Sequence, residues 1–406
     1  MTLRERIQQE IGKHGPIPFS RYMDLCLYEP ELGYYARHAG QFGKAGDFYT
    51  SSDVHAVFGR LLARQFDEMW RALGSPGRIG ILELGPGRGL FAHDVLDWTQ
   101  KKFPEFFGAL HYTLAENSPA LRERLQETLS MHLQSGKASL SSSFSAAKAA
   151  EENKALIAAR KPCATQDQTS PAYEIVPSPV SNPTIVFANE FFDALPVEVV
   201  GSKGELRIDL RNGQFVEKWV PASDEELEFL DRYSVHPEPG ERVEVPLPAR
   251  QCMGEVAQSL ERGFVIAIDY GYRRDEQLRG RHRGTVMTYR QHSASPNPYE
   301  APGEQDITAH VNFTALAAAA DECGMQAQEL LSQSQFLMGI GEANQFADAF
   351  EECRLPQERA KVALQLKHLV TPAGMGETFH VLVASKGVNV ESVARLGGLK
   401  FGRSKV

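Results

Sequence analysis

The sequence predicts an α/β fold in which a mostly parallel β-sheet is covered by helices on both faces. Short apolar runs of strand length alternate with amphipathic stretches of helix length, and this alternation is typical of sheets built from strand–helix–strand units. The apolar runs also end in glycine, acidic or amide residues. In an open parallel sheet, ligands bind beyond these strand ends.

The composition is ordinary for a globular protein. The chain has 406 residues, of which 42% are hydrophobic and 23% charged, and its formal net charge is −9. An excess of negative charge repels phosphate backbones, so we expect no nucleic-acid partner. The five cysteines never occur in CxxC spacing and the histidines show no HExxH pattern. We therefore predict no metal site.

No segment has the character of a targeting or membrane-spanning sequence. The first seven residues mix charges and lack the apolar core of a signal peptide. No apolar run reaches the roughly 18 residues that a transmembrane helix needs. Scattered cysteines are typical of a reducing compartment. Together these features predict a cytoplasmic protein without a membrane span.

Residues 1–75 are predicted to form a helical cap region that precedes the sheet. Leu3, Ile7 and Ile11 recur at helical spacing, and a wide apolar stripe between residues 57 and 73 marks a second helix. A glycine-rich loop at residues 40–50 lies between these helices.

Residues 76–386 are predicted to form the sheet domain. Helices are expected at residues 90–102 and 119–133, and residues 387–406 are expected to form a C-terminal tail. The predicted strands are the apolar runs at 79–84, 112–115, 184–188, 264–268 and 379–384.

Two insertions interrupt the predicted sheet domain. Residues 134–183 are rich in Ser, Ala, Gln and Pro, which predicts a mobile excursion with one helix at 146–160. Residues 205–248 have an antiparallel character. Asn212-Gly213 separates two strand-like runs there, and this dipeptide strongly indicates a hairpin turn.

The first motif that carries chemistry is the glycine turn ELGPGRG at residues 83–89. Such a turn lets a ligand approach the backbone. Glu83 places an acid beside the turn, where it complements the sulfonium and ammonium groups of S-adenosylmethionine but repels a pyrophosphate. The dinucleotide pattern GxGxxG also needs a third glycine at position 90, which is Leu90. We favour S-adenosylmethionine over a nicotinamide cofactor, with an ordinary strand–helix turn as the alternative.

Glu116 follows the next predicted strand. An acid at this place can accept hydrogen bonds from both ribose hydroxyls of a nucleoside. Its distance from Glu83 exceeds the usual interval of about 20 residues. Ser118 and Pro119 also indicate a helix start, so the acid could simply precede a capped helix.

A third polar group, Asn189, Glu190 and Asp193, follows the predicted strand at 184–188. An amide and two acids after a buried strand favour a functional site, although a capped helix start is the alternative. Asp269 also ends a strand on the same side. His310 is more often a structural residue than a base when no partner is known.

The ordered set of these segments resembles the MidA-like methyltransferases. This family includes a mitochondrial protein arginine methyltransferase that assists the assembly of respiratory complex I, and the resemblance covers about residues 16–385. The segments that carry it are PFSRYM at 18–23, ELGYY at 31–35, GDFYTS at 46–51, LELGPGRG at 82–89, ANEFFDALPVE at 188–198, IDYGY at 268–272 and DITAHVNF at 306–313.

The resemblance implies a class I, Rossmann-like methyltransferase fold, with a seven-stranded, mostly parallel sheet and an antiparallel last strand. It implies S-adenosyl-L-methionine as the cofactor and a protein arginine as the acceptor in the mitochondrial member. A respiratory-complex subunit as partner and a homodimer are further expectations. The cofactor-binding residues that it implies are Glu83, Gly85, Gly87, Gly89, Glu116 and Asp47.

We therefore predict an S-adenosylmethionine-dependent methyltransferase that acts on arginine in a partner protein. A guanidinium has a pKa above about 12, so carboxylates must orient it and accept a proton. The candidate catalytic residues are Glu190, Asp193 and Asn189, with Asp47 as a further carboxylate. The alternatives are a non-catalytic assembly factor with this fold and a methyltransferase of a small molecule.

Overall fold

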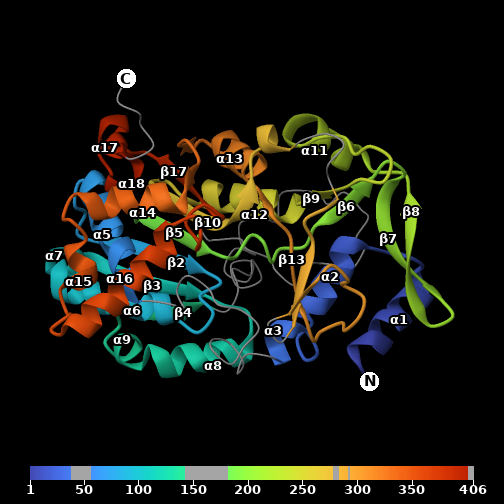
Figure 1. The fold of residues 1–406 in the computed structure, drawn as a ribbon, viewed down its shortest axis with the longest axis horizontal. Coiled ribbons are helices and arrows are strands. Elements are labelled where there is room, and N and C mark those ends of the chain that lie inside the picture. Colours follow the sequence, from blue (N-terminus) through green and yellow to red (C-terminus); the bar gives the residue numbers. More distant parts are fainter. Residues whose placement is uncertain (38–55, 142–181, 278–282, 291–292, 401–406) are drawn as a thin grey trace, which may run out of the picture.

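A mixed β-sheet with helices on both faces forms the centre of the computed structural model (Figure 1). The structure describes residues 1–37, 56–141, 182–277, 283–290 and 293–400. The strands of this sheet lie in the order β15-β17-β10-β5-β2-β3-β4, with β14 also paired to β10 and β16 to β17.

Most strands of the central sheet run parallel. They are β2 (Ile79–Leu84), β3 (Leu110–Ala115), β4 (Ala138–Ser141), β5 (Thr184–Asn189), β10 (Gly263–Tyr272) and β14 (Val311–Asn312). The antiparallel pairings all involve β17 (Phe379–Lys386). One edge of β17 pairs with β10, and the other pairs with the short strands β15 (Gln326–Ala327) and β16 (Leu331–Ser332).

The predicted mixed α/β sheet is confirmed, but the predicted number of seven strands is not. The described residues give this sheet nine strands. The pairs at β14, β15 and β16 are only two residues long, too short to produce a periodic apolar pattern. The strand β4 was also missed, because its sequence ASLS lies in the segment predicted to be mobile and contains no apolar run.

Burial on both faces explains why the strands are nearly continuous apolar runs. Phe187 of β5 packs with residues of α5 and α6, whereas its neighbour Val186 packs with residues of α12 and α13. Phe91 of α6 stacks on Phe187 with the ring centroids 4.3 Å apart. These helices are α5 (Ala56–Ala72), α6 (Leu90–Lys102), α12 (Leu247–Ser259) and α13 (Phe313–Glu322).

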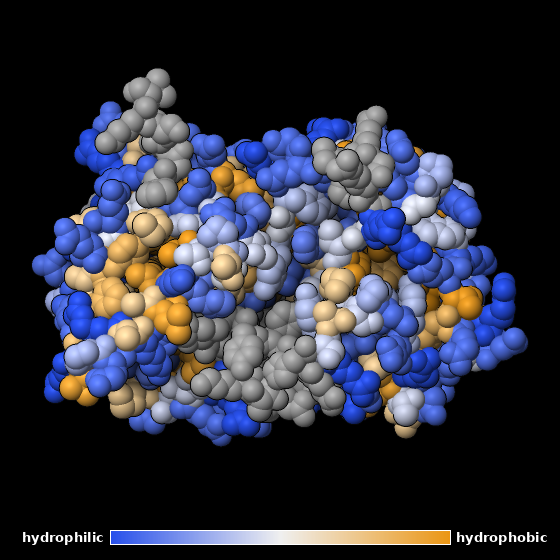
Figure 2. All heavy atoms as spheres, viewed as in Figure 1, coloured by the Kyte–Doolittle hydropathy of each residue, from blue (hydrophilic) through white to orange (hydrophobic). Residues whose placement is uncertain are grey.

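The boundary at residue 75 stays a prediction. The helix α5 lies before it in sequence but shares a core cluster with the sheet. The remaining helices of this half are α7 (Pro104–Ala109), α8 (Pro119–Thr128), α9 (Ser130–Gln134), α14 (Gln333–Glu342), α15 (Ala347–Phe350), α16 (Pro356–Val370), α17 (Val390–Ala394) and α18 (Gly397–Lys400). Figure 2 shows apolar side chains gathered over α14 and α16 on a face that is otherwise largely hydrophilic.

A second sheet lies beside the first, in the order β1-β7-β6-β9, with β8 paired to β7. The turn between β7 and β8 has Asn212 at φ 52° and Gly213 at φ 74°, as a two-residue hairpin requires. The elements of this half are α1 (Leu3–His14), β1 (Ile17–Pro18), α2 (Phe19–Tyr28), β6 (Glu198–Gly201), β7 (Gly204–Arg211), β8 (Gln214–Val220), α11 (Asp224–Tyr233) and β9 (Arg242–Val245).

A small third sheet, in the order β12-β11-β13, completes the described architecture. Ile307 of β13 packs into the same core cluster as α1 and α2. The remaining elements are α3 (Tyr34–Arg37), the short 3-10 helix η1 (Arg274–Glu276), β11 (Met287–Arg290), β12 (Ser293–Ser295) and β13 (Asp306–Thr308).

Three expectations fall outside the described residues: the loop at 40–50 with Asp47, the helix at 146–160, and most of the predicted mobile insertion. Within the part of the chain that the structure describes, every helix is too short or too polar to cross a bilayer.

Candidate active site

A cavity of about 380 Å³ lies at the carboxyl ends of β2, β3 and β5. The register of the parallel strands brings these ends together, since Leu84 pairs with both Ala115 and Ala188. The opposite wall comes from the end of α2, from α3 and from β13. The cavity therefore lies between the central sheet and the N-terminal helices.

The glycine turn after β2 has three glycines in the left-handed region, with φ of 64° at Gly85, 53° at Gly87 and 76° at Gly89. Gly85 and Gly87 line the cavity. Gly89 is not among the lining residues, and a Cβ there would come within 2.7 Å of Leu125 Cδ2 on α8. The first two glycines thus face the cavity, whereas the third allows a helix to pack closely.

Glu83 is a buried acid at the base of this turn. The Tyr112 hydroxyl donates a hydrogen bond to Glu83 Oε2 at 2.9 Å. Burial raises the pKa of Glu83 to about 8, although the tyrosine hydrogen bond acts in the opposite direction. A cationic ligand in the cavity would favour the ionised form of this acid.

Glu116 lies at the end of β3 and also lines the cavity. Its Oε1 accepts a hydrogen bond from the Ser118 backbone N–H at 2.8 Å, and burial raises its pKa to about 7. The Ser118 hydroxyl caps α8 by accepting from the Leu121 N–H at 3.4 Å. The acid in the cavity and the helix cap therefore exist side by side, so the two interpretations of this segment do not exclude each other.

The segment after β5 is conformationally unusual at Glu190. This residue has φ 51°, a region that non-glycine residues rarely adopt and that often marks functional sites. Its backbone N–H donates to the Ile268 carbonyl at 2.9 Å, and its Oε1 accepts from Asn189 Nδ2 at 3.1 Å. The buried Asn189 Oδ1 has no hydrogen-bond partner among the described residues. Both side chains line the cavity.

Asp193 and Asp269 form a buried acidic pair behind this segment. Asp269 Oδ2 accepts from three successive backbone N–H groups, at 3.2 Å from Phe191, 2.9 Å from Phe192 and 3.3 Å from Asp193. These donors favour the charged form of Asp269, but burial, followed by the charge of Glu190, outweighs them and raises the pKa of Asp269 to about 8. Burial, followed by the charges of Asp269 and Asp306, raises the pKa of Asp193 well above its usual range. Asp193 Oδ1 has no hydrogen-bond partner within the described part of the chain.

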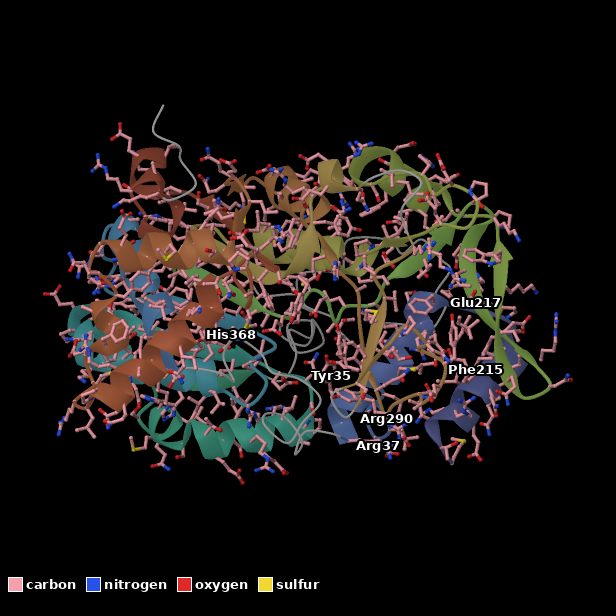
Figure 3. The ribbon with its side chains drawn as sticks, viewed as in Figure 1. Tyr35, Arg37, Phe215, Glu217, Arg290 and His368 are labelled. Carbon is pink, nitrogen blue, oxygen red and sulfur yellow. The ribbon has the colours of Figure 1, made fainter. Side chains whose placement is uncertain are left out.

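The structure adds Asp306, Tyr35 and Tyr28, which the sequence analysis did not single out. The Tyr35 hydroxyl donates to Asp306 Oδ1 at 3.2 Å, and the Tyr28 hydroxyl donates to the Ala194 carbonyl at 2.9 Å. All three side chains line the cavity, and Figure 3 shows Tyr35 near the middle of the molecule. They belong to α2, α3 and β13, so no local sequence pattern could bring them together.

Two further residues singled out in the sequence, His310 and Asp47, are not among the described residues of the cavity wall. His310 is not among the residues that line the cavity. Its ring stacks on Tyr270 with the centroids 6.4 Å apart, and its pKa is lowered by burial and by His380. Asp47 lies outside the described residues.

Comparison with known proteins identifies the family. Residues 61–331 match the model of the family described as "Putative S-adenosyl-L-methionine-dependent methyltransferase". The chain belongs to this family. The match covers most of the central sheet and the predicted site residues from Glu83 to Asp193, so the predicted methyltransferase and its cofactor, S-adenosylmethionine, are confirmed at the level of the family.

Sequence similarity to named relatives extends over almost the whole chain. The protein is 30% identical to the mitochondrial protein arginine methyltransferase NDUFAF7 homolog of Drosophila melanogaster, over 95% of this chain and 85% of the relative. It is 25% identical to mitochondrial NDUFAF7 of Homo sapiens, over 92% of this chain and 81% of that protein. The predicted resemblance to the family of this arginine methyltransferase is thus confirmed.

A solved structure supports the fold independently. A superfamily member from Burkholderia thailandensis, bound to S-adenosyl-homocysteine, superposes with a TM-score of 0.76 at 27% sequence identity. The alignment covers 97% of this chain and 94% of that one.

The prediction of a cytoplasmic protein is contradicted, because the relatives from Drosophila and human are named as mitochondrial proteins. The prediction depended on the mixed charges at the start of the sequence and on unpaired cysteines. Unpaired cysteines are found in every reducing compartment, so they could not distinguish one such compartment from another.

The cavity suits the cofactor of the family. Its lining combines the acids Glu83 and Glu116 with apolar side chains such as Leu90 and Phe91. A nucleoside with a cationic amino-acid tail needs this combination, since its hydroxyl and ammonium donors require acceptors and its adenine requires an apolar surface. The cavity volume of about 380 Å³ lies within the range of small-molecule sites.

Proposed function

We propose that this methyltransferase transfers methyl groups to arginine side chains of a partner protein. The observation that carries the proposal is the group of carboxylates, Glu190, Asp193 and Asp306, in the wall of the same cavity as Glu83 and Glu116. A guanidinium presents five N–H donors in a planar fork and matches carboxylate acceptors well. The names of the relatives from Drosophila and human support the same acceptor.

We assign cofactor contacts to Glu83, Gly85, Gly87 and Glu116, and a packing role to Gly89. S-adenosylmethionine, when bound, supplies the methyl group on a sulfonium. Glu83 provides a negative charge for its cationic groups, and Glu116 provides an acceptor for its hydroxyls. Asp47 is proposed to lie near the cofactor on the resemblance of its sequence segment alone.

The acidic side chains of the cavity have two tasks in this proposal. Glu190, held in place by Asn189, orients the guanidinium so that one nitrogen faces the methyl group; such alignment supplies much of the rate in a transfer reaction. That nitrogen loses a proton as it gains the methyl group. Asp193 is suited to accept the proton, because burial and its acidic neighbours raise its pKa.

The sheet is proposed to be the class I methyltransferase sheet with seven strand positions. The antiparallel strand β17 lies between β10 and the short strands β15 and β16. We propose that β15 and β16 together occupy a single edge position, which leaves six parallel positions and one antiparallel strand, with β14 as an addition beyond the end of β10.

Incubation of the purified protein with labelled S-adenosylmethionine and a lysate from cells that lack it tests the acceptor. We expect a labelled protein band in which mass spectrometry places the methyl group on an arginine. Label confined to small molecules, or placed on lysine, would contradict the proposal.

A further inference from the structure

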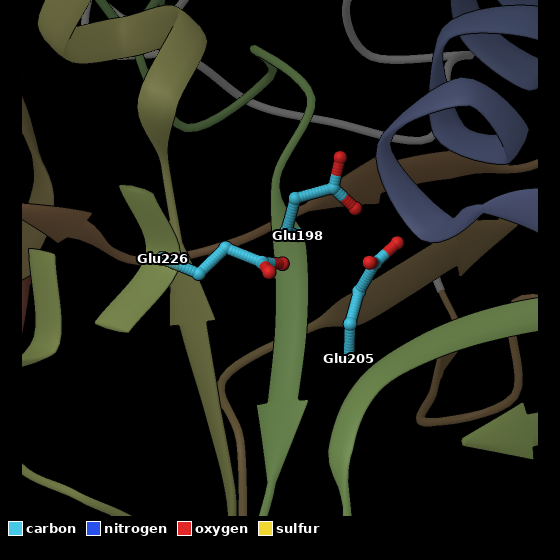
Figure 4. Close-up of side chains that lie close together, drawn as sticks. All are labelled: Glu198, Glu205 and Glu226. Atoms are coloured by element: carbon cyan, nitrogen blue, oxygen red, sulfur yellow. The ribbon is translucent and has the colours of Figure 1, made fainter. Parts of the chain in front are cut away.

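Three glutamates from separate elements meet outside the active-site cavity. Glu198 lies on β6, Glu205 on β7 and Glu226 on α11. One carboxylate oxygen of each lies within 4.8 Å of those of the other two. Figure 4 shows the three side chains converging, with the Glu226 carboxylate directed toward the space between the others. Glu205 is 6% exposed and Glu226 is 2% exposed.

The hydrogen bonds around the cluster leave one oxygen unsatisfied. Glu198 accepts from the backbone N–H and the hydroxyl of Ser20, and Glu205 accepts from Arg207 at 3.0 Å and 3.4 Å. Glu226 Oε2 accepts from Ser223 at 2.6 Å and 2.8 Å. Glu226 Oε1 is fully buried without a hydrogen-bond partner among the described residues, and a buried carboxylate oxygen in that state is costly.

The charges of the cluster are also out of balance. Among the described residues, Arg207 is the one cation that forms an ion pair with these three carboxylates, so two negative charges remain when all three acids are ionised. Buried like charges are strongly unfavourable unless a cation or protons neutralise them. Protons are the alternative to a metal ion, and burial raises the pKa of Glu198 to about 7.

We propose that Glu198, Glu205 and Glu226 bind a hard divalent cation, with Ca²⁺ as the best match. Carboxylate oxygens are the ligands that such ions prefer. Calcium–oxygen distances of about 2.3–2.6 Å allow two ligands of one ion to lie up to roughly 4.6–5.2 Å apart, so oxygens that lie within 4.8 Å of one another can share one ion. Ca²⁺ accepts irregular sets of oxygen ligands, as side chains from two strands and a helix provide, whereas Mg²⁺ demands near-ideal octahedral geometry.

The site would join separate elements of the molecule. Glu198 and Glu205 lie on the paired strands β6 and β7, and Glu226 lies in the first turn of α11. Through Ser20, Glu198 also holds the start of α2. A cation at this place would tie the second sheet to α11 and α2, and would stabilise the half of the protein that carries one wall of the cavity.

Titration of Ca²⁺ into the metal-stripped protein at pH 7.5 tests this proposal by calorimetry and thermal unfolding. We expect saturable binding with Kd of about 10⁻⁵ to 10⁻³ M and a rise in Tm of about 3 °C or more at saturation. The variant Glu226→Gln should weaken binding at least about tenfold. Glutamine can retain the capping interaction with Ser223, so the helix start should stay intact.

Glu225→Gln is the matched control, since Glu225 is the exposed neighbour of Glu226 in the same helical turn. It should bind Ca²⁺ as the unmodified protein does. The absence of heat and of a Tm change with both Ca²⁺ and Mn²⁺ at about 10 mM, ten times the weakest expected Kd, would overturn the proposal. So would binding that is equally strong in the Glu198→Gln, Glu226→Gln double variant, because that result would place the ion elsewhere.

Discussion

At the scale of single residues, several acids lie at or beside the active-site cavity, where little water is present to stabilise their charged forms. Glu83, Asp193 and Asp269 are buried and their pKa values are raised by that burial. A cavity with this character attracts a cation, because a bound positive charge replaces the missing solvation. The acids therefore favour both a sulfonium cofactor and a guanidinium acceptor.

The variants Glu190→Gln and Asp193→Asn should separate chemistry from cofactor binding. Each removes a charge but keeps the shape of the side chain, so we expect S-adenosylmethionine affinity to stay within about threefold while turnover falls at least about 100-fold. Calorimetry measures the affinity, and the labelled-methyl assay measures turnover. Glu300→Gln, at an exposed position, should leave both unchanged; full turnover in Glu190→Gln would remove that residue from the proposed mechanism.

At the scale of elements, the turn between β2 and α6 serves two purposes with one glycine pattern. Gly87 lies at the cavity, where a Cβ would meet no atom within 4 Å. Gly89 lies against α8, where a Cβ would come too close to Leu125 and Leu129. The same residue type therefore admits a ligand at one position and a neighbouring helix at the other.

Alanine at these two positions should give opposite profiles. Gly89→Ala adds a clash to an unfavourable φ, so we expect a loss of about 2–4 kcal/mol in the free energy of unfolding. Gly87→Ala should cost only about 1–2 kcal/mol, from its φ alone, but should reduce cofactor affinity because the methyl group enters the cavity. Denaturant unfolding and calorimetry check these values. A larger stability loss at Gly87 than at Gly89 would contradict this division of roles.

At the scale of the whole molecule, the cavity joins two layers that are built by different parts of the chain. The central sheet provides the glycine turn and the acids that follow its strands, while α2, α3 and β13 provide the opposite wall. The hydrogen bond between Ser118 and the Tyr35 carbonyl, 3.1 Å long, connects the two layers directly. A ligand that fills the cavity therefore stabilises the molecule as a unit.

The stability of the ligand-free protein should fall as the pH rises. The pKa values of Glu83, Asp269 and Glu116 in the folded state are raised to about 8, 8 and 7, whereas unfolded acids titrate near about 4. Between these values the folded state binds more protons than the unfolded state, so stability is greatest below about pH 4 for these groups and is lost toward pH 8.

We accordingly expect Tm without cofactor to be at least about 5 °C lower at pH 8.5 than at pH 6, and Glu83→Gln to reduce this difference. Saturating S-adenosylmethionine should stabilise the protein more at pH 8.5, because its positive charge favours ionised Glu83. Thermal scans over this range measure both effects. A Tm that rises with pH in the unmodified, ligand-free protein would refute the assignment.

The sequence was sufficient to predict which side chains line the cavity wherever they lie at the end of a buried strand. Glu83 and Asn189 lie within the last two residues of β2 and β5, and Glu116 directly follows β3, because parallel strands place their carboxyl ends at one edge of the sheet. The pairing of Tyr35 with Asp306 could not be predicted, since 271 positions separate the two residues. The glutamate cluster could not be predicted either, since it depends on how α11 packs beside the paired strands β6 and β7. Glycine spacing alone could not show that Gly89 faces a helix.

The position of β17 has a consequence for the order in which the protein is made. This strand pairs with eight residues of β10, yet it lies more than a hundred positions later in the chain, at Phe379–Lys386. During synthesis, β10 therefore emerges with the backbone N–H and C=O groups of one edge unpaired until the more distant β17 has been translated. Uncovered edges of this kind invite wrong pairing with other chains. We expect the nascent protein to depend on chaperones until β17 leaves the ribosome.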